Sequence, residues 1–417
     1  MQADLLENKT NSYWYILRYA GLHLLLLISV YIIYVLITGR ELIHSPNSFY
    51  RNDVRFYAGI KNSGYNYVDY TGTNIAFFPG FPYLWRFTGL GIYGIIVLNI
   101  LMFYSGFVLI AKQFVFSKKE ILLFLSLPSL CFMYVPYSEA LFFLVSVFLL
   151  CGMLKQNTIM VMIGLFVCSL CRSAANVFLP AIIITELIAA SNPHRFRNIL
   201  LYSFSALAGV FIVSWLQYSQ TGEWIGFIKT QKYWGVGFRF PQLPFTTWGD
   251  KNYLDGGALL AGICASAMMV YYFFRWIFKV EQQKNKAFIF SLLCVAGLTF
   301  FTIAFKGGSL FSLNRYIIPT AFFAVAFSFS MRQLQLSFKQ VWITLFCIFA
   351  FWLVMGSYVH ILVLAGYLLF TLYILLYLFL NNKNALIGNI AFYLVYVINL
   401  IVQVMYFYQF TTGGWVG

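Results

Sequence analysis

The chain has 417 residues, of which 61% are hydrophobic and only 9% are charged, and its formal net charge is +15 at pH 7. Soluble domains carry about 25% charged residues, so this composition excludes a water-soluble globular protein. The Lys and Arg residues lie mainly in short connections between apolar runs, which is typical of the cytoplasmic loops of membrane proteins. We therefore relate the positive charge to membrane orientation and do not expect nucleic acid as a partner.

Apolar runs of about 20 residues, the length that crosses a hydrocarbon core as a helix, recur along the whole chain. They predict an all-α polytopic membrane protein with about thirteen transmembrane helices, over the approximate ranges 16–38, 90–111, 120–136, 138–154, 158–172, 175–190, 198–219, 256–278, 287–305, 315–331, 340–356, 359–380 and 386–408. Residues 1–417 are expected to form a single domain. Its long external loops are 39–89, with short amphipathic helices, and 220–255, and residues 340–417 form scaffold helices.

The distribution of charge predicts how these spans are oriented. With a cytoplasmic N-terminus, the cytoplasmic connections hold thirteen cations, namely Lys112, Lys118, Lys119, Lys155, Arg195, Arg197, Arg275, Lys279, Lys284, Lys286, Arg332, Lys339 and Lys383. The short external connections then hold only Arg172, Lys306 and Arg315. Both long loops lie on this external side, together with the turn before Glu139. Because ionisable groups near lipid mark functional sites by default, we expect a site at the external face.

The stretch from Arg51 to Arg86 is the first long polar segment after an apolar span, and it carries a run of tyrosines. Within it, Asp53 opens a short helical pattern that places Tyr57 on a related face. Asp53 follows Asn52 and could serve as the cap of this helix. Alternatively, its carboxylate could act as a general base at the membrane surface.

The aromatic segment 77–82 (FFPGFP) follows in the same loop. Two prolines around a glycine forbid a continuous helix, so the chain must turn here. Its aromatic residues, including Phe78, are typical of an interfacial belt. The functional alternative is that this turn holds the helix of Asp53 over a site.

Tyr137, Ser138 and Glu139 lie between two apolar runs, and Glu139 begins the second of them. A carboxylate at a helix N-terminus is favourable electrostatically, which explains Glu139 without a function. The same carboxylate lies at the rim of the bilayer, where it is a candidate for substrate binding together with Tyr137 and Ser138.

Arg172 interrupts an apolar stretch that is too long for one span, which predicts a tight reversal at this position. Its side chain could reach toward lipid headgroups or bind a phosphate, for which the forked guanidinium donors are suited. The same two alternatives apply to Arg315. Lipid headgroups and a phosphate are also the alternatives for Lys229, Lys232 and Arg239, the cations that alternate with aromatic residues in the segment 229–239. Trp234 in the same segment is a further candidate for the pocket.

Several common signatures are missing from the sequence. We find no phosphate-binding glycine loop and no Cys/His cluster with zinc spacing, and the four histidines are scattered. The seven cysteines fall in apolar runs and do not indicate disulfides. No cofactor and no divalent metal is therefore expected.

The candidate segments together resemble a known family of membrane enzymes. Asp53 with Gly64-Tyr65, the segment 76–82 (AFFPGFP), the segment 137–142 (YSEALF) and Cys171-Arg172-Ser173 are similar, in order and spacing, to the second mannosyltransferase of GPI-anchor assembly. This family belongs to the GT-C superfamily of membrane glycosyltransferases. The similarity covers about the first 200 residues. Asn52, where the family tends to have Trp, departs from its pattern and leaves the acceptor open.

The resemblance implies a GT-C-like bundle and an inverting transfer of mannose or a related hexose from a polyprenyl- or dolichyl-phosphate donor. It implies Asp53 as the base, and a glycan, glycolipid or protein as the acceptor. The membrane is expected to be a bacterial inner membrane, with its lipids around the protein and the site facing outward. One alternative is a transporter or flippase of lipid-linked saccharides, whose polar residues should lie near the midplane. A second is a membrane acyltransferase with a buried histidine.

Overall fold

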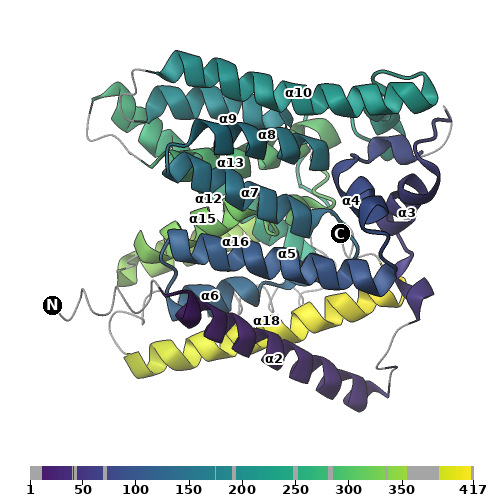
Figure 1. The fold of residues 1–417 in the computed structure, drawn as a ribbon. Helices are drawn as coiled ribbons and strands as arrows, with labels where there is room; N and C mark the ends of the chain where they lie inside the picture. The colour runs from purple at the N-terminus through teal and green to yellow at the C-terminus, as the bar shows by residue number, and fades with distance from the viewer. Residues whose placement is uncertain are drawn as a thin grey trace.

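The computed structural model describes residues 12–39, 41, 45–68, 73–173, 175–189, 194–247, 252–279, 285–333, 337–354 and 385–414. The elements within these residues are α2 (Tyr13–Thr38), η1 (Pro46–Phe49), α3 (Asp53–Ser63), η2 (Asn74–Ala76), α4 (Gly80–Thr88), α5 (Ile92–Gln113), α6 (Lys118–Leu125), η3 (Pro128–Tyr134), α7 (Glu139–Leu154), α8 (Thr158–Cys171), α9 (Ala175–Ile188), α10 (Arg195–Thr221), α11 (Gly226–Lys229), η4 (Thr230–Trp234), α12 (Asn252–Ile277), α13 (Lys286–Lys306), α14 (Leu313–Ile317), α15 (Ala321–Gln333), α16 (Phe338–Val354) and α18 (Ala385–Thr411). The predicted all-α class is confirmed for this described part of the chain (Figure 1).

Six helices are long and apolar enough to cross a membrane, namely α2, α5, α10, α12, α13 and α18. The pair η3 and α7 adds a seventh if these helices, which meet at 101°, are counted as one bent span. The apolar helices α8, α9, α15 and α16 have only 13 to 17 residues, fewer than the roughly 20 that a straight span needs. The expected count of about thirteen spans is therefore not confirmed. The expected span 359–380 lies outside the described residues.

The expected span 120–136 is not one helix, because α6 ends at Leu125 and the chain continues as the 3-10 helix η3. This break exposes backbone groups inside the bundle, where they need partners from the protein itself. The Gln403 amide on α18 donates to the carbonyls of Leu125 and Leu127, at 3.3 and 3.2 Å. The Asn399 amide of the same helix donates to Ser126, at 3.3 Å. Helix α18 therefore stabilises the break through its buried amides.

Glycines allow the helices that follow this break to approach one another closely. A Cβ atom at Gly164 of α8 would lie 2.8 Å from the Cα atom of Leu149 on α7. A Cβ atom at Gly209 of α10 would lie 2.6 Å from the Phe166 carbonyl oxygen on α8. Small residues at helix contacts are the usual device for close packing in a membrane, where apolar burial between helices is no driving force.

The first loop gathers at one end of the bundle, where α3 and α4 lie beside the end of α10 (Figure 1). Side chains from the last turns of α10 hold this loop in place. The Gln217 amide donates to the Ile75 carbonyl at 2.8 Å. Gln220 accepts a hydrogen bond from the Tyr65 N–H at 2.7 Å. The expected convergence of the first loop with the end of α10 is therefore found in the structure.

The connections that carry most of the expected cytoplasmic cations lie at the opposite end, because α7 to α10 run back and forth between the two ends (Figure 1). Two of the cations form ion pairs there: Lys286 with Glu186 at 2.6 Å, and Arg332 with Glu120 at 3.0 Å. The basic connections are therefore separated from the first loop by the length of the helices. Which end faces the cytoplasm remains a prediction.

Candidate active site

Asp53 is the first residue of α3 and lies in the first loop. The cap position is occupied by Asn52, and no side chain forms a capping hydrogen bond there. Asp53 is therefore not the helix cap, which was the simpler alternative. Its carboxylate instead accepts a hydrogen bond from the Arg315 guanidinium, with 2.5 Å between Oδ2 and Nη1.

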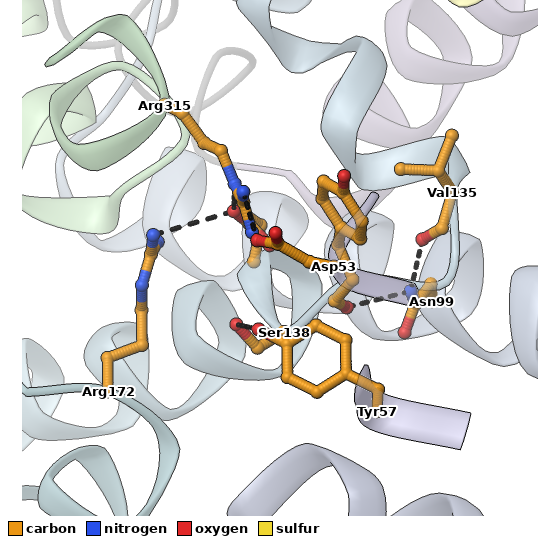
Figure 2. Close-up of polar contacts among 9 residues, drawn as sticks. Asp53, Tyr57, Asn99, Val135, Ser138, Arg172 and Arg315 are labelled. Carbon is orange, nitrogen blue, oxygen red and sulfur yellow. Dashed lines mark hydrogen bonds and ion pairs between the residues drawn. The ribbon is translucent and has the colours of Figure 1, made fainter. Parts of the chain in front are cut away.

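Four charged side chains from four parts of the chain form one network, which we call the charged cluster: Asp53, Glu139, Arg172 and Arg315. Arg315, on the short helix α14, binds Asp53 through Nη1 and Glu139 through Nε. The Arg172 Nη2 atom lies 3.5 Å from the same Glu139 oxygen. Figure 2 shows Arg315 and Arg172 both directed toward this group from different sides. The sequence prediction that these residues converge is thus supported by the geometry.

The charged cluster is buried to different degrees along its length. The Glu139 side chain is 0% exposed and that of Arg315 is 6% exposed, whereas Asp53 and Arg172 are 13% and 14% exposed. Two carboxylates and two guanidinium groups carry no formal net charge, which limits the cost of removing them from water. The contacts run from Asp53 through Arg315 and Glu139 to Arg172. The two more exposed members, Asp53 and Arg172, are therefore the two ends of this series.

Two atoms of the cluster have no hydrogen-bond partner among the described residues: the Oε2 atom of Glu139 and the Nη1 atom of Arg172. The Arg172 guanidinium lies over the rings of Phe142 and Tyr316, 5.6 and 5.5 Å from their centroids. Cation–π contacts of this kind hold a guanidinium in place without using its N–H donors. Arg172 therefore keeps a buried N–H donor without a partner, and forked guanidinium donors suit phosphate.

Arg315 was expected to bind a donor phosphate, and in the structure it contacts the two carboxylates of the cluster. Its Nε and Nη1 donors bind Glu139 and Asp53, and its guanidinium lies 4.1 Å from the centroid of the Tyr137 ring. The single positive charge of Arg315 is therefore already balanced by two carboxylates, whose negative charges disfavour a third anion beside it. Arg315 therefore joins the two carboxylates, whereas Arg172 contacts one carboxylate and two rings.

The predicted pocket residues Tyr57, Tyr137 and Ser138 lie beside the charged cluster (Figure 2). The Tyr57 hydroxyl donates to the Ser138 hydroxyl at 3.1 Å, which joins α3 to the start of α7. Burial raises the pKa of Tyr57 above its ordinary value, so this hydroxyl stays protonated and acts as a donor.

The turn in the segment 77–82 connects the helix of Asp53 with the reversal at Arg172. A Cβ atom at Gly80 would lie 3.0 Å from the Cα atom of Cys171, so only glycine fits there without a shift. Phe81, next in the chain, contacts the Tyr57 ring at 5.2 Å between centroids. This geometry supports the functional alternative for the turn, because it joins α3 to the end of α8.

The remaining predicted residues lie in the second loop or against it. Lys229 forms an exposed ion pair with Glu223 at 2.6 Å, and the Lys232 ammonium lies 4.8 Å from the Tyr233 ring centroid. These local contacts differ from the expected role of both lysines in phosphate binding. Trp234 packs on the rings of Phe56 and Phe77, and Phe78 packs on the ring of Phe227. The backbone N–H of Arg239 donates to the Ala304 carbonyl.

Two residues that support the cluster were not singled out in the sequence. The Asn99 amide of α5 donates to the carbonyls of Val135 and Tyr137, at 2.6 and 3.0 Å, and so holds the turn before Glu139 (Figure 2). Asp255, at the start of α12, accepts hydrogen bonds from the backbone and the side chain of Asn314, next to Arg315. Asn99 could have been identified in the sequence as a polar residue within an apolar run, and Asp255 as a single carboxylate at the start of a predicted span.

Within the described residues, no group of three or more His, Cys, Asp or Glu side chains is arranged to hold a metal ion. Comparison of the chain with protein-family models, with curated proteins and with solved structures finds no match. The chemistry of the charged cluster is therefore the basis for proposing a function.

Proposed function

We propose that this protein is an inverting glycosyltransferase of GT-C type. It would transfer mannose or a related hexose from a polyprenyl-phosphate-linked donor to the hydroxyl of a glycan, glycolipid or protein acceptor. The observation that carries the proposal is the arrangement of the charged cluster. The two ends of its chain of contacts are a carboxylate, Asp53, and an arginine, Arg172, whose side chains are 13% and 14% exposed; Arg172 also has a buried donor without a partner.

The proposed reaction needs one base and one stabilised leaving group. Asp53 takes the proton of the acceptor hydroxyl, and the acceptor oxygen attacks the anomeric carbon of the sugar. The bond between that carbon and the phosphate oxygen breaks, and polyprenyl phosphate leaves with the electron pair. Attack from the face opposite the phosphate inverts the anomeric configuration. Glycoside hydrolysis differs because it requires a carboxylic acid to protonate its leaving group.

The roles of the two arginines differ in this proposal. Arg172 donates to the departing phosphate, for which a fixed cation in a site of low polarity is an effective stabiliser. Arg315 holds Asp53 in the direction that proton transfer requires, because a base must lie within hydrogen-bond reach of the hydroxyl. Glu139 is completely buried and binds both arginines, so its role is to align them.

The location of the cluster favours an enzyme over the alternative of a transporter. Asp53 begins α3, and ion pairs connect it through Arg315 and Glu139 to Arg172, so the cluster lies beside the first loop. Helices α3 and α4 of this loop gather at one end of the bundle (Figure 1). A transporter site is expected near the middle of the bundle, with access from both sides. A site at one membrane face suits a donor whose phosphate lies at the surface and whose lipid tail stays in the bilayer.

Transfer from polyprenyl-phosphate mannose, measured with the purified full-length protein in lipid nanodiscs, tests this proposal. The substitution Asp53→Asn should abolish transfer of the labelled sugar to an acceptor lipid extract, while the elution volume and thermal stability of the protein stay close to wild type. The matched control is Glu223→Gln, which removes a carboxylate outside the cluster and should retain activity. Wild-type transfer that persists in the Asp53→Asn variant would contradict the proposed mechanism. Absence of a hexosyl polyprenyl phosphate among co-purified lipids, together with no transfer by wild type, would refute the class.

A further inference from the structure

A segment of the second loop, residues 236–246, lies along the end of α13, and we call it the strap. The N–H groups of Gly237 and Arg239 donate to the carbonyls of Phe305 and Ala304, at 2.8 and 3.0 Å. The Gln242 N–H donates to the Gly307 carbonyl at 3.2 Å. The last carbonyls of a helix have no partner within the helix. The strap supplies such partners and is thereby held at the level of the last turn of α13.

The strap exposes three large apolar side chains close together in the sequence. Phe238 is 76% exposed, Phe240 is 88% exposed and Leu243 is 67% exposed. Phe238 contacts the ring of Phe305 on α13 at 6.0 Å between centroids, but most of its surface remains uncovered. Adjacent exposed apolar groups in one short segment mark an interaction surface, whereas single ones are ordinary.

The depth of the strap follows from the helix that holds it. Helix α13 is long and apolar enough to cross a membrane, and its exposed Phe300 (74%) lies six residues before the end at Lys306. Six residues correspond to about 9 Å along a helix axis. The end of a spanning helix lies where the hydrocarbon core meets the headgroups, so the strap lies at that depth as well.

The charge of the strap matches the phosphate groups at this depth. The strap contains one cation, Arg239, and no Asp or Glu. Arg239 is exposed between Phe238 and Phe240. Aromatic residues with an adjacent cation are typical of segments at the membrane interface, where rings enter the acyl boundary and cations meet lipid phosphates.

We infer that the strap is a membrane-interfacial anchor whose partner is the phospholipid leaflet around the protein. Phe238, Phe240 and Leu243 enter the boundary between headgroups and acyl chains, and Arg239 binds lipid phosphate. This surface is continuous with the lipid-facing side of α13, which extends to Phe300. The inference does not depend on the proposed glycosyltransferase activity, because it concerns only the depth and the surroundings of the strap.

Nitroxide spin labels attached to the full-length protein test this inference. Cys264 and Cys347, the exposed cysteines of the described part, are first replaced by serine. A label is then placed on Phe238→Cys, Phe240→Cys or Leu243→Cys in nanodiscs of phosphatidylcholine with phosphatidylglycerol. Relaxation by oxygen, which concentrates in lipid, is compared with relaxation by a water-soluble nickel chelate.

Two control labels define the scale, namely Phe300→Cys on the apolar face of α13 and Ser63→Cys on the exposed end of α3. At the three strap positions we expect oxygen to relax the label more than the nickel chelate does, as at Phe300→Cys. Greater relaxation by the nickel chelate, as at Ser63→Cys, would show that the strap lies in water and would overturn the inference. Low access to both reagents would show that protein covers the strap and would also overturn it. Unchanged elution and melting temperature of each labelled variant establish that it is folded.

Discussion

The substitution Arg315→Met tests whether the charged cluster is held together by buried ion pairs. Arg315 is the only cation that an observed contact joins to both Asp53 and Glu139 within the described part of the chain. Methionine keeps much of the side-chain volume but removes the charge. Glu139, with an exposed fraction of 0%, then retains Arg172 at 3.5 Å as its cationic partner. Asp53 loses the cation that now lies 2.5 Å away.

The expected magnitude follows from the burial of the cluster. Removing one partner from a buried ion pair costs about 3–5 kcal/mol, because a charge is left without compensation in a medium of low polarity. The matched control is Lys229→Met, which breaks a pair of similar length, 2.6 Å, whose side chains are 44% and 28% exposed. An exposed pair contributes only about 0–1 kcal/mol. The two variants differ in the burial of the broken ion pairs and in their number, which is two for Arg315 and one for Lys229.

The free energy of unfolding of both variants is measured by titration with SDS in mixed micelles, with tryptophan fluorescence as the signal. The loss of unfolding free energy should be several-fold larger for Arg315→Met than for Lys229→Met. The variant Arg315→Lys keeps the charge but loses the forked geometry, so it should fall between them. Equal losses for Arg315→Met and Lys229→Met would refute the reasoning, because burial would then have no effect on the energy of the pair.

Two further predictions concern the elements that support the site. Asn99→Leu removes the Asn99 amide, which donates to the carbonyls of Val135 and Tyr137. The Val135 carbonyl keeps the Tyr137 N–H as a donor, so the cost should be about 1–3 kcal/mol for the Tyr137 carbonyl, with a lower melting temperature in detergent. An unchanged melting temperature would show that these hydrogen bonds are not needed. Gly209→Ala should destabilise the protein by about 1–3 kcal/mol, because the added methyl group would lie 2.6 Å from the Phe166 carbonyl oxygen. In the control Gly21→Ala the methyl group meets no atom within 4 Å, so this substitution should not lower the stability. Equal melting temperatures for these two glycine variants would contradict the close packing of α8 and α10.

Residue types and their order predicted the helical membrane class and included all four members of the charged cluster among the candidates, together with Lys229 and Lys232, which lie outside it. Charges are rare in this chain, and each one inside or beside an apolar run is costly, so their positions are informative. The alternation of spans then predicted that Asp53, Glu139 and Arg172 would meet at one end, and the contacts of the charged cluster agree.

The pairing within the cluster did not follow from the sequence. Arg315 and Arg172 occupy similar positions in the chain pattern, but only the fold shows that Arg315 bridges two carboxylates while Arg172 lies over two rings. Likewise, the residues 120–136 have the apolarity of a span, yet they are divided between α6 and η3 and stabilised by amides of α18. Apolarity and spacing report which segments avoid water. Hydrogen bonds and ion pairs depend on the rotation of each helix and on distances of a few tenths of an ångström, which arise only when all the helices are packed together.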